Sequence, residues 1–301
     1  MELQKIERWS LVGHLVSMAF GLAGLLIVLP HAELILQLPP IGQTVFQLSM
    51  ANGGVVYILL GTIAVAIYAY QMLGINQLLC FMIPAVGLSL GSELLGTSTG
   101  LPFGDYGYLS GLGYKIAGLV PFTIPLSWFY LGFSCYIIAR AGFDNTQLPN
   151  WLRHCAAIFC GALLLTAWDF VLDPAMSQTA VPFWEWKTPG PFFGMPYSNF
   201  AGWMETGAVF MSVAALLWPK ERIQLDRTQL QLPMAIYLGN FVFAAVLSMA
   251  GNIWIPMLLG IAVGIVPLFL LWFAAQPTLA NVVGLADLEL ESPAEYIVSG
   301  K

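Results

Sequence analysis

The chain has 301 residues, of which 58% are hydrophobic and 9% are charged, and its formal net charge is −6. Ordinary globular domains carry roughly 25% charged residues, so this composition excludes a soluble protein and predicts an integral membrane protein. No basic region is dense enough to bind nucleic acid, and the three histidines and four cysteines are too scattered for a metal cluster.

A helix that spans a membrane needs roughly 20 mostly apolar residues. Eight stretches meet this requirement, with approximate bounds 11–29, 50–70, 77–96, 117–138, 155–173, 202–218, 233–251 and 253–273. The first is too long for a signal peptide, so we expect it to be retained as a membrane helix. We therefore predict an all-α, polytopic membrane bundle of about eight transmembrane helices. Residues 1–276 would form this single domain, and residues 277–301 would form an acidic tail.

Some finer features of these helices also follow from the sequence. Pro125 is expected to kink the fourth helix. Only Gly251-Asn252 separates the last two stretches, which predicts a tight helical hairpin or one broken helix. The glycine pairs 87/91 and 260/264 have GxxxG spacing, which predicts close packing between helices.

The basic residues indicate the orientation of the bundle. If the N-terminus is cytoplasmic, only Lys115 and Lys187 fall outside, and the other Lys and Arg residues fall inside. Cytoplasmic loops carry an excess of Lys and Arg, so we predict that both termini are cytoplasmic.

Two long loops on the predicted outer side have an unusual composition. Residues 96–118 and 174–201 are rich in Gly, Pro and aromatic residues and poor in charge. Solvated loops would carry more charged residues. We expect these loops to fold onto the membrane surface or into the bundle, where protein covers their irregular backbone.

Acidic residues fall within the apolar stretches, close to these loops: Glu93, Asp169, Asp173 and Glu205. A charge at membrane depth is costly, so such residues are functional candidates. Asp169 and Asp173 are four residues apart and share a helix face. Repulsion in a dry site favours one proton shared between them, and a protonated carboxylic acid can act as a general acid. The alternative is that these acids satisfy helix ends or pair with Lys115, Lys187 or a nearby tyrosine.

Aromatic residues surround these acids. They are Trp168, Phe183, Trp184, Trp186, Phe192, Phe193 and Trp203, with Tyr106 and Tyr108 from the other loop. They form either an interfacial aromatic belt or the lining of a site that grips an isoprenoid ligand and steadies a cation. Asn199 lies at the same level and can hold a water or a hydroxyl group.

Three long motifs carry a resemblance to a known family. They read SELLGTSTGLPFGDYGY from Ser92, WDFVLDPAM from Trp168 and WEWKTPGPFFGMPYSNFAGW from Trp184. These motifs resemble those of the CruF-type carotenoid 1,2-hydratases, which are membrane proteins of carotenoid biosynthesis. The resemblance covers roughly residues 10–275.

The resemblance implies cofactor-independent addition of water to the terminal 1,2 double bond of an acyclic carotenoid end, as in lycopene or γ-carotene. Protonation, a tertiary carbocation and capture of water would give a tertiary alcohol, a product that feeds xanthophylls. The implied catalytic residues are Asp169, Asp173 and Glu93, with no metal. The implied substrate-binding residues are Phe103, Tyr106, Trp184, Trp186, Asn199 and Trp203; Glu205 is added although it lies outside the motifs.

The implied partners are a lipid-soluble carotenoid and membrane lipid, with a downstream carotenoid glycosyltransferase as a candidate. Plasma and thylakoid membranes are the expected locations.

Two other functional classes stay open. One is another isoprenoid enzyme, such as a lycopene-cyclase-like protein, or a prenyltransferase, for which Asp169 and Asp173 would supply a single Asp cluster. The other is a proton-coupled transporter, although no inverted repeat is visible and the acids lie near one surface.

Overall fold

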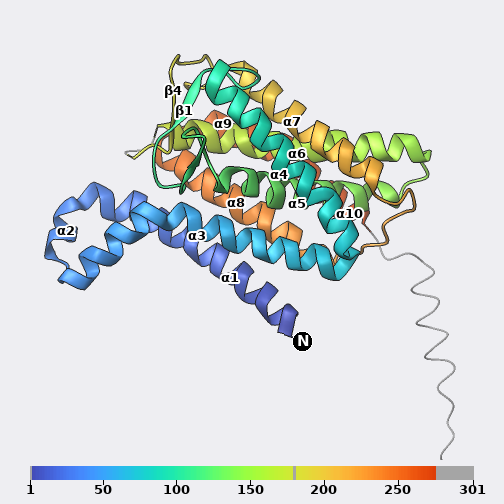
Figure 1. Ribbon diagram of the computed structural model, residues 1–301, viewed down its shortest axis with the longest axis horizontal. Coiled ribbons are helices and arrows are strands. Elements are labelled where there is room, and N and C mark those ends of the chain that lie inside the picture. The colour runs from blue at the N-terminus through green and yellow to red at the C-terminus, as the bar shows by residue number, and fades with distance from the viewer. Residues whose placement is uncertain (1, 179–180, 276–301) are drawn as a thin grey trace, which may run out of the picture.

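The computed structural model describes residues 2–178 and 181–275, and its architecture is helical (Figure 1). The helices are α1 (Glu2–Ala23), α2 (Ala32–Gln37), α3 (Pro40–Leu73), α4 (Ile75–Thr99), α5 (Thr123–Asp144), α6 (Asn150–Ser177), α7 (Tyr197–Leu217), α8 (Gln231–Ala250), α9 (Trp254–Gly260) and α10 (Val266–Ala274). π-helical turns at Gly24–Val28 and Ile261–Ile265 and a 3-10 turn at Leu29–His31 continue α1 and α9. Short strands lie in the loops: β1 (Tyr106–Tyr108), β2 (Lys115–Ile116), β3 (Val120–Pro121) and β4 (Trp184–Trp186). The predicted acidic tail, 277–301, lies outside the described residues.

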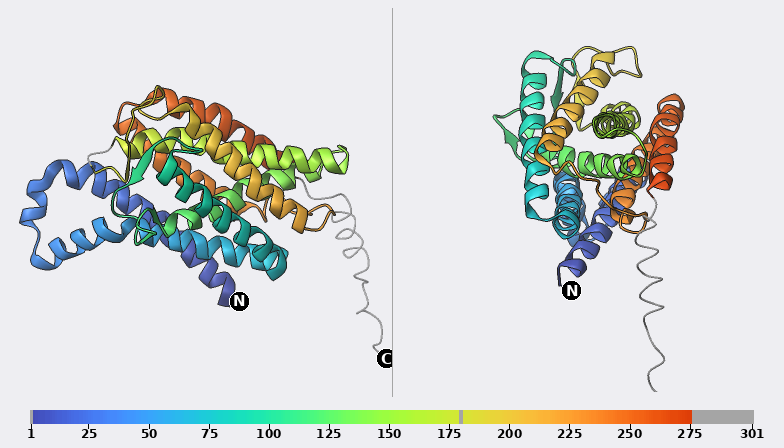
Figure 2. Two further views of the ribbon diagram at one scale, coloured as in Figure 1. Left: turned by 45° about the horizontal axis from the view of Figure 1, so that its top comes forward. Right: turned by 90° about the vertical axis from the view of Figure 1, so that its right-hand side faces the viewer.

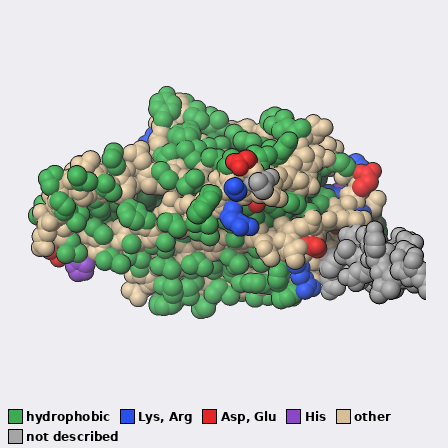
Figure 3. All heavy atoms as spheres, turned by 90° about the horizontal axis from the view of Figure 1, so that it is seen from below, with side chains coloured by type: hydrophobic (Ala, Val, Ile, Leu, Met, Phe, Trp, Pro, Cys, Tyr) green, Lys and Arg blue, Asp and Glu red, His purple; other side chains and the backbone are tan. Residues whose placement is uncertain are grey.

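The outer surface of the bundle is apolar. Within the described residues, seven helical segments are long and apolar enough to cross a membrane, α9 and α10 together forming one of them. Large side chains such as Trp9, Phe159 and Leu216 face outward. Figure 3 shows a face covered mostly by hydrophobic side chains. Contiguous apolar surface of this extent indicates contact with lipid, which confirms the predicted membrane bundle.

The long helix α5 is not among those seven apolar segments, and it lies inside the bundle. It packs against α3, α4, α6, α8 and α10, and nearly all of its residues are buried. A helix shielded from lipid needs no uniformly apolar surface. We predicted about eight transmembrane helices; seven described segments are long and apolar enough to cross a membrane, and α5 is an eighth long helix inside the bundle.

The start of α5 differs from the prediction. The helix begins at Thr123 and not near residue 117, because Lys115–Ile116 and Val120–Pro121 form a small antiparallel hairpin. Pro125 therefore lies in the first helical turn. The N–H groups of that turn have no partner within the helix, which removes the reason for the kink that we expected.

The glycine pairs have different surroundings. A Cβ at Gly260 would lie 2.3 Å from Val171 of α6, and a Cβ at Gly264 would lie 2.7 Å from the hydroxyl of Tyr237 on α8. Close packing is thus confirmed for this pair. Gly87 and Gly91 have nothing within 4 Å in the described part of the chain, so the prediction of close packing was wrong there. The last two stretches form the predicted hairpin, with α8 and α9 joined by residues 251–253.

The two ends of the bundle differ. The loops with strands cover one end, and a buried ion network holds the other end. Asp144 accepts hydrogen bonds from Arg140 Nε at 2.8 Å, from Arg153 Nη1 at 2.5 Å and from the amide of Ile223 at 2.8 Å. The three charged side chains are at most 2% exposed. Arg140 belongs to α5 and Arg153 to α6, and their pairing with Asp144 compensates for the burial of their charges.

Candidate functional site: an acidic chamber beneath a lid

The two unusual loops meet in a small antiparallel sheet, which we call the lid (β1 and β4). Its register pairs Tyr106 with Trp186, Gly107 with Glu185 and Tyr108 with Trp184. Alternate residues of a strand face opposite sides. The four aromatic residues therefore share one face, which points into the bundle, and Gly107 and Glu185 lie on the other.

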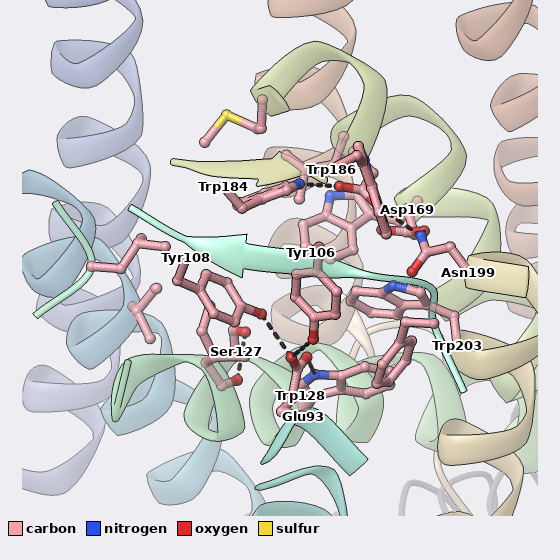
Figure 4. A pocket seen from close by; sticks show the side chains of 18 of the residues that line it. Glu93, Tyr106, Tyr108, Ser127, Trp128, Asp169, Trp184, Trp186, Asn199 and Trp203 are labelled. Atoms are coloured by element: carbon pink, nitrogen blue, oxygen red, sulfur yellow. Dashed lines mark hydrogen bonds between the residues drawn. The ribbon is translucent and has the colours of Figure 1, made fainter. Parts of the chain in front are cut away.

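Beneath the lid lies a chamber that includes about 690 Å³ of space between atoms, counting its open part. Its walls come from α3 to α7 and the lid. The lining residues are Tyr57, Ile58, Glu93, Phe103, Tyr106, Tyr108, Leu112, Ile124, Ser127, Trp128, Tyr130, Trp168, Asp169, Leu172, Asp173, Met176, Trp184, Trp186, Asn199 and Trp203. The chamber thus combines carboxyl groups with aromatic rings (Figure 4).

Glu93 projects from α4 and is the most fully hydrogen-bonded acid of the chamber. Tyr108 donates to Glu93 Oε2 at 2.8 Å, Tyr106 donates to the same oxygen, and Trp128 Nε1 of α5 donates to Oε1 at 2.9 Å. Figure 4 shows these donors converging on the carboxyl group. The side chain is 3% exposed. Three donors around one carboxyl group suit its ionised form, since a carboxylate only accepts hydrogen bonds.

The lid tyrosines are suited to this role. Burial raises the pKa of Tyr106 and Tyr108 well above the usual value of 10.0, and the charge of Glu93 raises both further. Both phenols therefore stay protonated near neutral pH and remain donors to Glu93.

Asp169 and Asp173 project from the last turns of α6 and share one hydrogen-bond donor. The amide Nδ2 of Asn199 lies 2.7 Å from Asp169 Oδ2 and 2.7 Å from Asp173 Oδ2. Trp184 of the lid donates from its indole nitrogen to Asp173 Oδ1. The aspartates are 1% and 4% exposed. They therefore form a true pair, as their spacing predicted, and one amide fixes the separation of their two oxygens.

Glycines make room for the aromatic walls. A Cβ at Gly96 of α4 would lie 2.8 Å from the ring of Phe103, and a Cβ at Gly202 of α7 would lie 2.5 Å from it. Real Cβ atoms do not approach other atoms so closely, so the Phe103 ring fits between α4 and α7 only because neither residue has a side chain. The rings of Trp128 and Trp203 also stack on one another, with their centroids 3.9 Å apart.

Two indole N–H groups of the chamber stand apart from this network. Nε1 of Trp168 and Nε1 of Trp186 are buried, and neither has a hydrogen-bond partner among residues 2–178 and 181–275. A buried donor without a partner is costly.

A protein-family model described as "Carotenoid biosynthesis protein" matches residues 53–267. The chain belongs to this family. The chamber residues from Tyr57 to Trp203 all lie within the matched region of this carotenoid biosynthesis protein.

A curated relative is 35% identical over 130 residues, which make up 43% of this chain and 41% of the relative. That relative is the bisanhydrobacterioruberin hydratase of Haloarcula japonica. The carotenoid biosynthesis protein thus spans about two fifths of the length of the relative that it matches. No solved structure matches it.

The structure brings together nearly all of the residues that we singled out. Glu93, Asp169 and Asp173 line the chamber, as do the predicted binding residues Phe103, Tyr106, Trp184, Trp186, Asn199 and Trp203. Glu205 does not line it. This residue is exposed on α7 and lines a separate groove, because it lies on another face of the helix from Asn199 and Trp203. Among the described residues, no group of three or more His, Cys, Asp or Glu side chains is placed to hold a metal ion.

Sequence reasoning missed Trp128, the donor to Glu93 from α5, and Tyr57 and Tyr130. These residues lie inside apolar helices without a nearby acid in the sequence. Only the positions of α3 and α5 beside α4 reveal that they face the chamber.

Proposed function

We propose that this protein is a carotenoid hydratase, which adds water to the terminal 1,2 double bond of an acyclic carotenoid end to give a tertiary alcohol. The observation that carries the proposal is the aspartate pair, bridged by Asn199 and facing aromatic walls. The family supplies the substrate class, and the relative named a hydratase supplies the reaction class.

The first step is protonation of the double bond. One proton shared by Asp169 and Asp173 passes to C2 of the end group, and the π electrons form the new C–H bond. The positive charge then rests on C1, which is tertiary and is the more stable position. A buried pair of acids that share a proton is suited to this donation.

The cation must then survive until water reaches it. Glu93, surrounded by donors that favour its ionised form, supplies the compensating negative charge. The rings of Trp128 and Trp203 supply aromatic faces, which attract cations. Walls of this kind also limit loss of a proton from the cation.

Capture of water completes the reaction. The water donates one hydrogen bond to the aspartate carboxylate left by the first step, and a lone pair of its oxygen attacks C1, which forms the C–O bond. The proton that the water then loses returns to the aspartate pair. Each step is a proton transfer or the addition of water, so the pair ends as it began.

The test is Asp169→Asn and Asp173→Asn, each expressed in a lycopene-producing cell, with mass analysis of the extracted pigments. Pigment from cells with the wild-type protein should gain the mass of one water. Each variant should hydrate about 10²- to 10⁴-fold more slowly, which is the usual contribution of a general acid. Glu185→Gln, an acid on the outer face of the lid, is the control and should behave as the wild type. Hydrated product from both aspartate variants would refute the mechanism, and a product of unchanged mass would indicate cyclisation instead.

A further inference from the structure

A groove runs along the outer face of the bundle between α4 and α7, which lie side by side (Figure 2). It includes about 860 Å³ of space between atoms, counting the part open to the surroundings. Its apolar lining includes Leu88 and Leu95 of α4, Val209 of α7 and Pro102 of the following loop. Because α4 and α7 cross the membrane, this groove faces the lipid.

The groove and the chamber meet at two consecutive residues of the chain. Pro102 lines the groove, and the next residue, Phe103, lines the chamber. The Phe103 ring lies between Gly96 and Gly202, at the end of the groove where α4 and α7 have no side chains to close the gap. A molecule that moved from the groove into the chamber would therefore have to displace the ring of Phe103.

The groove also carries polar groups that a purely lipid-facing surface would not need. Thr206 is 3% exposed, lines the groove, and its hydroxyl has no hydrogen-bond partner in the part of the chain that the structure describes. Glu205 lies beside it in the groove. Carboxyl groups at membrane depth are costly and therefore functional by default. A hydroxyl and a carboxyl group in an apolar groove match a long apolar molecule that carries an alcohol.

We propose that this groove is the lateral passage of the chamber. The carotenoid enters from the lipid, its end group passes Phe103, and its polyene chain stays in the groove during the reaction. The tertiary alcohol then leaves along the same path past Thr206 and Glu205. This inference rests on the proposed function. It follows because Pro102 of the groove and Phe103 of the chamber are neighbours, the lid covers the end of the bundle beside the chamber, and an apolar chain is most stable in contact with lipid.

The experiment narrows the groove with Leu95→Trp or Val209→Trp. The matched controls are Ile83→Trp on α4 and Leu216→Trp on α7, both lipid-facing and outside the groove. Narrowing should slow hydration of a carotenoid by about tenfold or more, as misfit in an apolar pocket does, and the controls should match the wild type. A short alkene with the same terminal double bond should still be hydrated by the narrowed variants. Equal carotenoid rates in narrowed and control variants would overturn the passage while leaving the proposed function intact.

Two further measurements separate the parts of the proposal. If the wild type hydrates no carotenoid, the proposed function fails, and the amount of carotenoid retained by the purified protein then tests the groove alone. Less retained carotenoid in the narrowed variants than in the controls supports the passage, and equal amounts overturn it.

Thr206→Val should lower the steady-state rate without changing the first turnover, because it removes a contact of the departing alcohol. An unchanged steady-state rate would overturn the role of Thr206.

Discussion

At the scale of single residues, Asn199 determines the geometry of the aspartate pair. It is the third residue of α7, and its amide nitrogen contacts carboxyl oxygens of two residues of α6 that are one turn apart. Among the residues that the structure describes, no other donor contacts both acids. The sequence placed the acids on one helix face, but nothing in it indicated that one amide serves both.

Replacing Asn199 by Leu, which has a similar size, tests this role. We expect hydration to fall on the order of 100-fold, because small displacements of reacting groups have effects of that size. Pigment analysis in the lycopene-producing cell measures the loss, and thermal unfolding in detergent verifies that the variant is folded. Unchanged activity would show that the pair does not depend on the amide.

Gly202 is the second residue with a specific consequence. In Gly202→Ala the new Cβ would lie 2.5 Å from the Phe103 ring, which must therefore move. We expect lower activity on the carotenoid. The control is Gly207→Ala on the same helix, whose Cβ would meet Ala162 and Leu165 at an ordinary 3.4 Å. This control should keep its activity and gain up to about 1 kcal/mol from helix propensity. If both alanine variants behaved alike, packing at Phe103 would not matter for turnover.

At the scale of elements, the lid is the feature that the sequence hid most completely. Its strands have three residues each and lie in loops far apart in the chain. Three residues are too few for a periodic signal, and the pairing is non-local. The composition of the loops nevertheless indicated that they were not solvated, since many aromatic side chains with few charges among them need to be covered by protein or lipid.

The pairing can be tested with Gly107→Cys combined with Glu185→Cys. These residues are directly opposite on the outer face of the lid, where Cα atoms are about 4.5–5.5 Å apart, within the range of disulfides. We expect the cross-link to form on oxidation, as detected by mass spectrometry of peptides. Because the proposed passage runs through α4 and α7, the cross-linked protein should still hydrate carotenoid. Activity that disappeared on oxidation and returned on reduction would instead show that the lid must open.

At the scale of the whole molecule, the ion network around Asp144 secures the end of the bundle opposite the lid. It joins α5, α6 and the loop before α8. Removing one partner of a buried ion pair leaves a charge without compensation, which is far more harmful than losing an exposed pair.

Asp144→Asn should therefore lower the free energy of unfolding by about 3–5 kcal/mol, because two buried guanidinium groups lose their anion. Asp105→Asn is the control, since its pair with Lys187 is about half exposed and such pairs contribute about 0–1 kcal/mol. Thermal unfolding in detergent compares the two. Equal losses would show that burial of the network does not matter.

Hydropathy predicted the helices that contact lipid, because lipid requires an apolar surface. It was less accurate for segments that other parts of the protein cover. The start of α5 was placed too early, since apolar residues such as Leu119 and Val120 also suit a hairpin next to the bundle. Glu93 and the aspartates were found as costly charges in apolar segments. Trp128 and Tyr57 were not found, because an aromatic residue facing a chamber and one facing a neighbouring helix look the same in a sequence.

The position of the chamber near one end of the bundle has a consequence for substrates whose two tips are alike. A carotenoid that lies across the roughly 30 Å hydrocarbon core presents only one tip to the lid side at a time. The other tip then sits in the opposite leaflet, where α5 and α6 offer arginines and no acidic pair. To be hydrated at both ends, the molecule would have to leave the site and reverse its orientation in the membrane. The singly hydrated form should therefore accumulate first.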